Sequence, residues 1–533
     1  MSLTQLGTTT GRVESICQTA GYIRDPLIAY AELCKDSPYA LLLESAEIDS
    51  KDNLKSLLLV DAALRIECQH QDVTCSPVTS NGTNIIDIIK ANCPAQITCV
   101  SHDSGAITLS CPPSDPNSDE DTRLKSPSVF DALRAVINGI KAIRDVPHAV
   151  FLGGVFAYDL LATFEDLPTV DDSENTCPDY VFYVAETLLR IDHQAQTTDI
   201  VGSVFSGPNV ADNYLRINQR VEAIQTAISQ LPSALAPAPQ AASDKRVRVD
   251  KSDGDYVKDV EFLKEHILAG DIFQVVPSRT FSIACPSAEH AYATLRQQNP
   301  SPYMFFLKDA DFTMFGASPE SALKYSAISN IVEIYPIAGT RPRGKRPDGS
   351  LNHDLDSRIE LNLREDSKET SEHIMLVDLA RNDVARVSKA GTRYVKDLLK
   401  VDRYSHVMHL VSRVVGELRD DLDALHAYQA CMNMGTLVGA PKVSAASLIR
   451  ETEKQRRGSY GGAVGYLNGQ GDMDSCIVIR SAFVRNGVAY IQAGAGVVHD
   501  SIPQAEADET RGKAQAVITA ILSSQQTHAG ALS

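Results

Sequence analysis

Three apolar runs near the end of the chain, separated by Asn-Gly turns, constrain the fold more than any other feature. The runs cover 463–467, 476–484 and 488–492, and the dipeptides Asn468-Gly469 and Asn486-Gly487 stand between them. Asn-Gly is the strongest short signal for a hairpin, because both residues tolerate a positive φ. The pattern therefore predicts an antiparallel meander with helices packed on it, which is an α+β arrangement.

A helix followed by a strand is predicted upstream of the meander. Apolar residues recur every three or four positions after residue 255, Asp253 or Asp255 is available as the N-cap, and Gly270 follows as a stop signal. The segment 272–283 is rich in β-branched residues and predicts a strand.

Helices and strands are also predicted at the two ends of the chain. The segments 57–65 and 149–158 are apolar runs of strand length, and 129–143 has helical spacing. Ser501 and Pro503 indicate the N-cap and the first position of a last helix that reaches about residue 522.

Two low-complexity stretches suggest how the chain is organised. Residues 112–121 read as a solvated acidic loop, and the Pro/Ala-rich stretch 231–243 reads as a semi-extended linker. We therefore expect an N-terminal region over 1–230, a linker over 231–249 and a second domain over 250–525. No internal repeat is evident in the sequence.

Composition excludes several classes of function. The net charge of −18 at pH 7 disfavours binding to nucleic acid or to an anionic membrane. No apolar run approaches the ~20 residues that span a bilayer, and the N-terminus does not read as a signal peptide. The 11 cysteines form no C-x-x-C pair, so we expect reduced, mostly buried thiols in a cytoplasmic protein.

Two Glu-x-x-Glu pairs are candidate metal ligands. Glu369 and Glu372 lie in one predicted helix, and Glu506 and Glu509 lie in the first turns of the last helix, where Lys513 follows Glu509 by four residues. Residues three apart share a helix face, so each pair presents two carboxylates, and four such groups suit Mg²⁺. The alternative is that these acidic residues are solvated and favoured only by the helix dipole.

A glycine-rich turn follows the last strand of the meander. Gly494-Ala495-Gly496 would let backbone N–H groups approach an anion, whereas a simple turn is the alternative. His499 occupies the position where a dinucleotide-binding fingerprint has its third glycine, so that class is disfavoured.

Arg480 and His409 are the remaining candidates for chemistry. Alternation places Arg480 on the same strand face as Cys476 and Val478, where an arginine needs an anionic partner, either a salt bridge or a substrate carboxylate. His409 follows a moderately apolar stretch and is either structural or catalytic. The basic residues in 341–346 read as a solvated loop, and no serine-hydrolase, zincin, Walker or glutaminase-cysteine motif occurs.

Taken together, nine segments resemble the chorismate-utilising enzymes, and most closely the large subunits (component I) of anthranilate synthases. They follow the family order along nearly the whole chain. The segments are LLLESAEI (41–48), GDIFQVVPSR (270–279), NPSPYMFF (299–306), SPE (318–320), PIAGTRPRG (336–344), EHIMLVDLARNDVARV (372–387), GTLVGAPKVSA (435–445), RRGSYGGAVGY (456–466) and AGAGVVHDSIPQAEADET (493–510). The resemblance implies that family's fold, an α+β sandwich of antiparallel β-sheets with flanking helices.

The resemblance also implies a Mg²⁺ site and a chorismate site. Glu372 and Glu509 would bind Mg²⁺ with support from Glu369 and Glu506, and the ion would hold the ring carboxylate of chorismate. Charge-assisted donors and a metal suit a small dianion that must be held in one pose. The residues that the resemblance assigns to chorismate are Gly339, Thr340, Tyr460, Arg480, Gly494, Ala495, Gly496 and Lys513.

The implied reaction is amination of chorismate at ring carbon 2, followed by loss of pyruvate to give anthranilate. Glu320 would be the general acid for the departing hydroxyl on carbon 4, and His409 would assist pyruvate loss, with Thr340 and Gln274 completing the catalytic group. Ala338 stands where related aminodeoxychorismate synthases carry a nucleophilic lysine. Gln274 stands where isochorismate and salicylate synthases carry a lysine that activates water, so ammonia is the favoured nucleophile.

A tryptophan feedback site is implied as well. The LLES and SPYM segments would form it, and Tyr303 and Met304 offer apolar surface for an indole. The residues assigned to tryptophan are Glu44, Ser45, Lys55, Pro302, Tyr303, Met304, Val464 and Tyr466.

The family resemblance implies a partner and leaves alternatives open. No amidotransferase domain is present, so the chain would use free ammonia, or glutamine through a separate small subunit (component II) in a heterotetramer of two large and two small subunits. The alternatives are an aminodeoxychorismate or isochorismate synthase-like enzyme, and a non-catalytic tryptophan-binding regulator.

Overall fold

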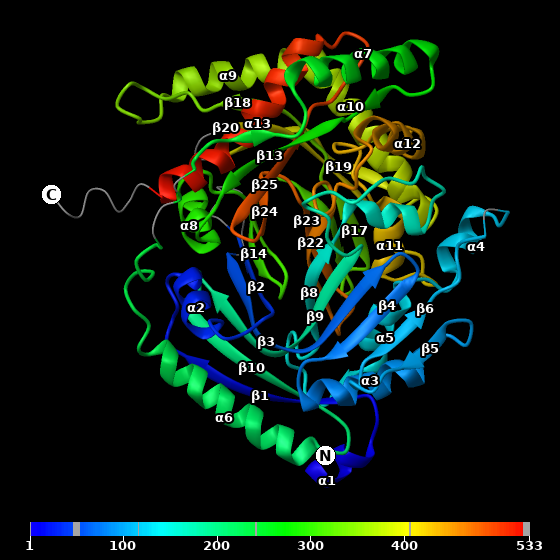
Figure 1. Cartoon of the computed structure of the whole chain (residues 1–533), viewed down its shortest axis with the longest axis vertical. Coiled ribbons are helices and arrows are strands. Elements are labelled where there is room, and N and C mark those ends of the chain that lie inside the picture. The colour runs from blue at the N-terminus through cyan, green and yellow to red at the C-terminus, as the bar shows by residue number, and fades with distance from the viewer. Residues whose placement is uncertain are drawn as a thin grey trace.

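A long antiparallel pair of strands lies at the centre of the fold, and two groups of strands extend from it (Figure 1). Its members are β3 (Lys55–Gln69) and β9 (Tyr180–Asp192). The structure is a computed structural model, and the residues that it describes are 2–45, 54–115, 117–239, 242, 244–404 and 407–525.

The first group, which we call the first arm, starts from β3 and runs to the edge of the molecule near α13. Neighbouring strands in it are antiparallel. In spatial order they are β2 (Ala40–Glu44), β14 (Tyr303–Lys308), β15 (Thr313–Ser318), β24 (Ser481–Arg485), β25 (Val488–Gly494), β13 (Ser278–Ala284) and β11 (Arg248–Val249).

The second arm starts from β9 and is also antiparallel. Its last two members both pair with β20. In spatial order the strands are β8 (Phe151–Phe156), β22 (Ala463–Asn468), β23 (Met473–Ile477), β16 (Ser321–Ser326), β17 (Ile331–Ile334), β20 (Val407–Glu417), and then β18 (Ile337–Pro342) and β19 (Tyr394–Arg403).

Further strands from the N-terminal half extend the sheet beside the central pair of β3 and β9. β10 joins β9 to β1, and β4 joins β3 to β6. The bounds are β1 (Arg12–Ala20), β4 (Asp72–Pro77), β5 (Thr98–Ser101), β6 (Ile107–Ser110), β7 (Lys141–Ala142) and β10 (Thr197–Phe205), with a separate pair β12 (Gln274–Val275) and β21 (Gly439–Ala440).

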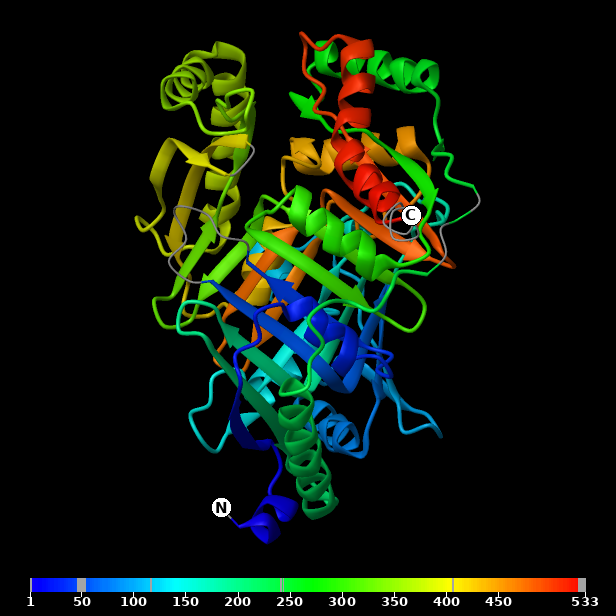
Figure 2. The same cartoon turned by 90° about the vertical axis from the view of Figure 1, so that its left-hand side faces the viewer.

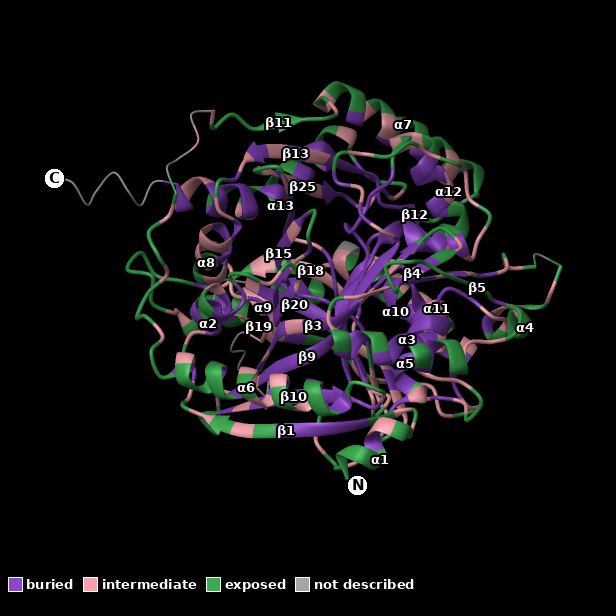
Figure 3. Ribbon diagram, turned by 60° about the horizontal axis from the view of Figure 1, so that its bottom comes forward, coloured by how far each residue is buried: buried purple, intermediate pink, exposed green. Residues whose placement is uncertain are grey.

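The two arms enclose one apolar core, which confirms the predicted sandwich. Phe305 and Met314 of the first arm and Val464 and Cys476 of the second belong to a single buried cluster, together with Phe151. Each fully buried side chain of this size contributes roughly 1.5–3 kcal/mol as an upper bound. Figure 3 shows the strands as the most continuously buried part of the molecule.

Helices cover the outer faces, as an α+β fold requires. α13 packs against α8 and α7, α10 packs on β20 and β18, and α6 packs on β10 and β1. The helices are α1 (Leu3–Thr8), α2 (Pro26–Leu33), α3 (Ser80–Asn92), α4 (Glu120–Lys125), α5 (Asp131–Gly139), η1 (Tyr158–Thr163), α6 (Val210–Ile228), α7 (Asp253–Ala269), α8 (Ala288–Gln298), α9 (His353–Glu365), α10 (Ser367–Val387), α11 (Ala424–Cys431), α12 (Lys442–Glu453) and α13 (Pro503–Ser524).

The predicted meander is present, but its middle strand is broken. The Asn486-Gly487 hairpin is confirmed, since φ is 52° at Asn486 and 73° at Gly487 and Arg485 pairs with Val488. The single strand expected over 476–484 is wrong, because the chain leaves the second arm after β23 and enters the first arm at β24. Arg480 lies at this crossing with a φ of 48°.

The predicted strand over 272–283 is interrupted in the same way. β12 pairs with β21 outside the main sheet, whereas β13 pairs with β25. A β-rich run shows that residues are extended, but it does not show that two halves pair with different partners.

Helix ends differ from the expectations by one to four residues. Ser252, not Asp253 or Asp255, caps α7, and Gly270 ends it with a φ of 86° as predicted. α13 begins at Pro503, but its N-cap is Ile502, and the Ser501 hydroxyl instead accepts from the N–H of Val498. The helix expected over 129–143 stops at Gly139, where the short strand β7 follows.

The N-terminal half contributes strands to both arms. β2 pairs with β14 in the first arm, and β8 pairs with β22 in the second. The expected boundaries at 230 and 250 remain a prediction, but residues on the two sides of the linker share one core. All 11 cysteines are free thiols, and eight of them are buried, as expected. No helix among the described residues is long and apolar enough to cross a membrane.

Candidate active site

Glu320 lies in the turn between β15 and β16 and is 6% exposed. The Thr436 hydroxyl donates to its Oε1 across 3.2 Å, and the N–H of Ile337 donates to the same carboxyl group. Burial raises the pKa of Glu320 to about 8, although these donors and the cations Arg480 and Lys513 all favour the charged form. A carboxyl group in this state is protonated near neutral pH and is able to donate a proton.

Arg480 stands between the two arms, close to the predicted acid. Its left-handed backbone conformation is costly for a residue with a Cβ, and such conformations gather at functional sites. Its charge acts on Glu320 and His409, and its own pKa is lowered by burial, which Glu320 partly offsets. The crossing from β23 to β24 therefore places a cation beside both predicted catalytic groups.

His409 and Thr340 meet across β20 and β18. The two residues are register partners, and the Thr340 Oγ1 lies 2.9 Å from the His409 Nδ1. A ring N–H of His409 also bonds to the backbone of Gly339, whose φ of 81° accompanies a bulge in the strand. Burial lowers the pKa of His409 to about 3, so the imidazole is neutral.

Tyr460, Gly494 and Lys513 form the opposite side of the site. The N–H of Gly494 donates to the Tyr460 oxygen, and Lys513 Nζ donates to the Gly494 carbonyl across 2.9 Å. Burial raises the pKa of Tyr460 to about 12, so its hydroxyl keeps its proton. A Cβ at position 494 would lie 2.6 Å from the Pro277 carbonyl oxygen, which explains the glycine. The Ala495 N–H donates to that carbonyl, so two of the three predicted amide donors already have protein partners.

Gln274 lies beside Gly496 at the end of the glycine-rich turn. It is 7% exposed, and a Cβ on Gly496 would come within 2.8 Å of its Nε2. Its Oε1 is buried and has no hydrogen-bond partner among the described residues. A buried acceptor without a partner is costly and is satisfied when a donor-bearing ligand arrives.

The four predicted metal ligands lie on α10 and α13, in two lobes that rise separately above the sheets (Figure 2). Glu369 Oε1 is 2.7 Å from an Arg341 nitrogen, and Glu509 Oε1 is 2.7 Å from Lys513 Nζ. Glu506 is buried, and Glu372 is partly exposed. No group of three His, Cys, Asp or Glu side chains suited to a metal occurs within the described ranges. Carboxylate oxygens are nevertheless the ligands that Mg²⁺ takes, and one carboxylate of each pair is at present compensated by Arg341 or Lys513.

Three of the predicted tryptophan residues line a cavity of about 840 Å³. These are Glu44, Ser45 and Met304, and Glu44 pairs with Met304 across β2 and β14. Arg296 bonds to Glu44 across 3.0 Å and to Asp25 across 2.8 Å, so the cavity wall alternates positive and negative charge.

The other predicted tryptophan residues are not brought into that cavity. Pro302 and Tyr303 line a second cavity of about 230 Å³ whose wall includes Tyr404. Val464 is buried between the arms, and Tyr466 stacks on Phe151 with ring centroids 5.3 Å apart. Lys55 is largely exposed and lies 3.7 Å from Asp192. Residues 46–48 of the LLLESAEI segment lie outside the described residues.

Sequence reasoning missed several residues of the site. Thr436 was part of the quoted GTLVGAPKVSA segment, but only the fold brings it to Glu320. The loop 341–346 was expected to be solvated, and this is wrong for two arginines: Arg341 binds Asp366 and Glu369, and Arg343 binds the buried Asp356. The signal that could have indicated these ion pairs is that the basic loop lies close in sequence to helices whose first turns are acidic.

Comparisons with known proteins identify the family of the chain. The profile of the chorismate binding enzyme family matches residues 90–519. The chain is 57% identical over 518 residues to anthranilate synthase component 1 of Vibrio cholerae, covering 97% of this chain and 98% of the relative.

Solved structures show the same fold. Anthranilate synthase component I from Streptococcus pneumoniae superposes with a TM-score of 0.65 at 26% identity, covering 94% of this chain and 99% of that one. The menaquinone-specific isochorismate synthase of Escherichia coli superposes with a TM-score of 0.66 at 16% identity, covering 97% of each chain, and this likeness concerns the fold alone. The chain therefore belongs to the chorismate binding enzymes and, within them, to the anthranilate synthase component I family.

Proposed function

We propose that the chain converts chorismate and ammonia into anthranilate and pyruvate, with Mg²⁺ as cofactor. The observation that carries this proposal is the buried carboxyl group of Glu320. Burial raises its pKa to about 8, although the charges of Arg480 and Lys513 act on it. An acid that is protonated beside two cations suits a reaction in which a hydroxide group leaves a dianionic substrate. The reaction named for the component 1 relatives supports the same reading.

Chorismate carries two carboxylates, and the site offers separate groups for them. Arg480 provides a partly buried guanidinium on one side, and Lys513 with the Tyr460 hydroxyl provides donors on the other. Charge-assisted hydrogen bonds in a water-poor site fix a small dianion in one orientation. The ring then lies along Gly339 and Thr340, where the absence of a Cβ at Gly339 leaves room near Glu369.

Glu320 and His409 have opposite protonation states near neutral pH: Glu320 carries its proton, and the His409 ring does not carry an extra one. Glu320 gives its proton to the hydroxyl that leaves ring carbon 4 as ammonia attacks carbon 2. His409 would assist pyruvate loss and aromatisation as a neutral imidazole whose ring Thr340 and Gly339 hold in place, and its pKa of about 3 makes it a weak base. Groups whose surroundings push their pKa values apart are a general signature of acid and base roles.

Two neutral residues favour ammonia over other nucleophiles. Gln274 is an amide and cannot deprotonate water, yet its free Oε1 is able to accept a hydrogen bond from an N–H of ammonia. Ala338 has no nucleophilic atom. The structure therefore offers no protein base or nucleophile at either of these two positions.

Glu372 and Glu509, supported by Glu369 and Glu506, would hold Mg²⁺. When bound, the ion would neutralise the ring carboxylate of chorismate and so favour its amination. Before that, Arg341 and Lys513 compensate the charge of Glu369 and Glu509.

We further propose that tryptophan inhibits the chain and that the cavity beside Glu44 takes its amino-acid group. The charged wall of Glu44, Asp25 and Arg296 matches an ammonium and a carboxylate, and Met304 offers apolar surface. The component 1 name of the relatives also supports a second component that supplies ammonia from glutamine.

The test is to identify the product formed from chorismate by liquid chromatography and mass spectrometry, with and without ammonium. Anthranilate formed only with ammonium would support the proposal. Isochorismate or aminodeoxychorismate would assign the chain to those reactions instead. Tryptophan binding with no turnover by the folded protein would identify a regulator without catalytic activity.

A further inference from the structure

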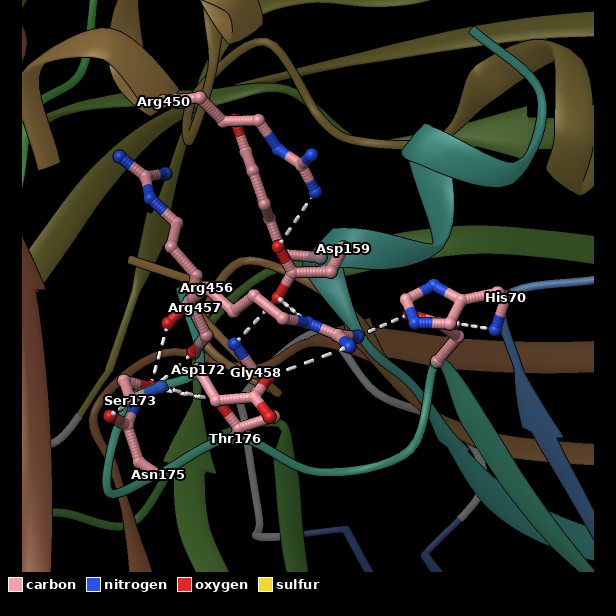
Figure 4. A network of polar contacts seen from close by, with 12 residues as sticks. His70, Asp159, Asp172, Ser173, Asn175, Thr176, Arg450, Arg456, Arg457 and Gly458 are labelled. Carbon is pink, nitrogen blue, oxygen red and sulfur yellow. Dashed lines mark hydrogen bonds and ion pairs between the residues drawn. The ribbon is translucent and has the colours of Figure 1, made fainter. Parts of the chain in front are cut away.

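The loop that carries Tyr460 is held by buried charges from the N-terminal half of the chain (Figure 4). This loop, 454–462, connects α12 to β22. The residues that hold it lie in η1 and in the segment 171–179, nearly 300 positions earlier in the sequence. Tyr460 itself faces Gly494 on the other side.

Asp159 makes three contacts with this part of the chain and is 3% exposed. Its Oδ2 accepts from the N–H of Gly458 across 2.8 Å and lies 3.7 Å from Arg456 Nε. Its Oδ1 accepts from Arg450 of α12 across 3.1 Å. One carboxylate therefore joins the end of α12, the loop and the backbone two residues before Tyr460.

Asp179 binds Arg456 from a second direction. Its Oδ1 pairs with Arg456 Nη2, and its Oδ2 accepts from the backbone N–H of His70 across 2.6 Å. Both aspartates are almost fully buried. Arg456 is thus compensated by two carboxylates, Asp159 of η1 and Asp179 directly before β9.

Backbone contacts hold the loop equally closely. The N–H of Tyr158 donates to the Gly458 carbonyl across 2.9 Å, and Ser173 Oγ donates to the Arg456 carbonyl across 2.8 Å. Gly458 has a φ of 62°, and a Cβ there would lie 2.2 Å from the Asn175 carbonyl oxygen. No other residue fits this position without moving the loop.

The next residue, Arg457, ties the loop to the substrate side. It is 1% exposed and binds Glu453, whose Oε1 also accepts from the N–H of Ser278 across 2.7 Å. Ser278 is the register partner of Gly494, which donates to Tyr460. A continuous series of hydrogen bonds and ion pairs thus joins the buried charges to the loop and the loop to the glycine-rich turn.

We propose that Asp159, assisted by Asp179, is a positioning residue that sets Tyr460 for the substrate, so that the N-terminal half takes part in chorismate binding. The inference rests on the proposed function. Removing one partner of a buried ion pair leaves the other charge uncompensated, and the loop then relaxes away from its position. Since Tyr460 would bind a carboxylate that takes no part in bond making or breaking when ammonia adds and the hydroxyl leaves, its displacement weakens binding and leaves turnover at saturation unchanged.

The test compares Asp159→Asn with Asp172→Asn in the full-length protein. Asp172 is a matched control because it also faces Arg456, 3.8 Å from Nη1, but its side chain is 73% exposed. We expect Asp159→Asn to raise the chorismate KM about tenfold, which is the size of one lost charge-assisted bond. The kcat, the ammonium KM and tryptophan binding should stay within about twofold of wild type. Asp172→Asn should match wild type throughout.

A milder variant keeps the test decisive if Asp159→Asn does not fold. Ser173→Ala removes only the hydroxyl that donates to the Arg456 carbonyl, and it should raise the chorismate KM about threefold. A wild-type chorismate KM in the folded Asp159→Asn protein, or in Ser173→Ala, would overturn the positioning role. A fall in kcat with unchanged KM would overturn it too. Wild-type protein that forms no anthranilate would instead refute the proposed function, and this measurement is made first.

Discussion

The hydroxyl of Thr436 donates to the buried carboxyl group of Glu320 across 3.2 Å. Burial dominates over this hydrogen bond and over two nearby cations, so the pKa of Glu320 rises to about 8. The protein thereby keeps a carboxylic acid protonated where a solvated one would be ionised. The assignment of Glu320 as the proton donor depends on this balance.

Glu320→Gln should lower kcat by about 10²–10⁴-fold, because an amide cannot donate the proton that the leaving hydroxyl needs. Steady-state rates with chorismate and ammonium measure this effect. Glu417→Gln is the matched control, since Glu417 pairs with Lys389 at the far end of β20. Equal kcat in Glu320→Gln and wild type would remove Glu320 from the mechanism.

The same substitution should change how stability depends on pH. The folded protein binds the Glu320 proton more tightly than the unfolded chain, so the free energy of unfolding falls as pH rises from about 4.5 to about 8. Glu320→Gln carries no ionisable group and avoids this loss. Thermal unfolding at pH 6 and pH 9 should therefore show a smaller pH-dependent decrease in Tm for the variant than for wild type.

His409 should not limit activity on the acidic side. Because its pKa is lowered to about 3, it stays neutral down to that range, and kcat/KM between pH 5 and pH 7 should show no loss from its protonation. Thr340→Val removes the hydroxyl that faces Nδ1 and should lower kcat about tenfold without moving the pH profile. An acidic limb near pH 6.5 that disappears in His409→Asn would show that His409 titrates normally.

Glu509→Gln should abolish Mg²⁺-dependent activity and weaken binding of Mn²⁺, used as a spectroscopic probe, by at least about tenfold. Asp508→Asn is the control on the same helix, because Asp508 is exposed and pairs with Arg511 instead. Electron paramagnetic resonance of free Mn²⁺ measures the affinity independently of turnover. Activity that survives Glu509→Gln would show that the metal assignment is wrong.

Tryptophan binding can be followed directly, since the chain itself contains no tryptophan. The fluorescence of added tryptophan then reports only the ligand. Glu44→Gln should weaken its affinity about tenfold or more, because the ammonium loses a carboxylate partner whose side chain is only 8% exposed. Glu222→Gln, on the exposed face of α6, is the control. Unchanged affinity in Glu44→Gln would place the amino group elsewhere.

The sequence predicted helix ends and turns correctly where the conformation of one or two residues determines them. Gly270 ends α7 and Asn486-Gly487 forms a hairpin, because a positive φ at those residues is a local property. The crossing at Arg480 was not predictable, since the run 476–484 is apolar apart from Arg480 and Ser481 and reads as one strand. Only long-range pairing divides this run, because its first part, in β23, pairs with β16, and its last part, in β24, pairs with β15.

The candidate site was predicted through the resemblance more than through spacing. Thr340 and His409, 69 positions apart, were both proposed and meet across two strands. The tryptophan residues were proposed as one group, yet Met304 and Tyr303 face different cavities because successive residues of a strand point to opposite faces. Asp159 had no signal at all, since its role depends on a loop nearly 300 residues away.

The most direct test of the account is the fluorescence of anthranilate formed from chorismate and ammonium at mildly alkaline pH. It is measured with and without Mg²⁺, and with and without tryptophan. The account predicts anthranilate that forms only with Mg²⁺ and decreases when tryptophan is added. Folded protein that forms no anthranilate under any of these conditions would contradict it.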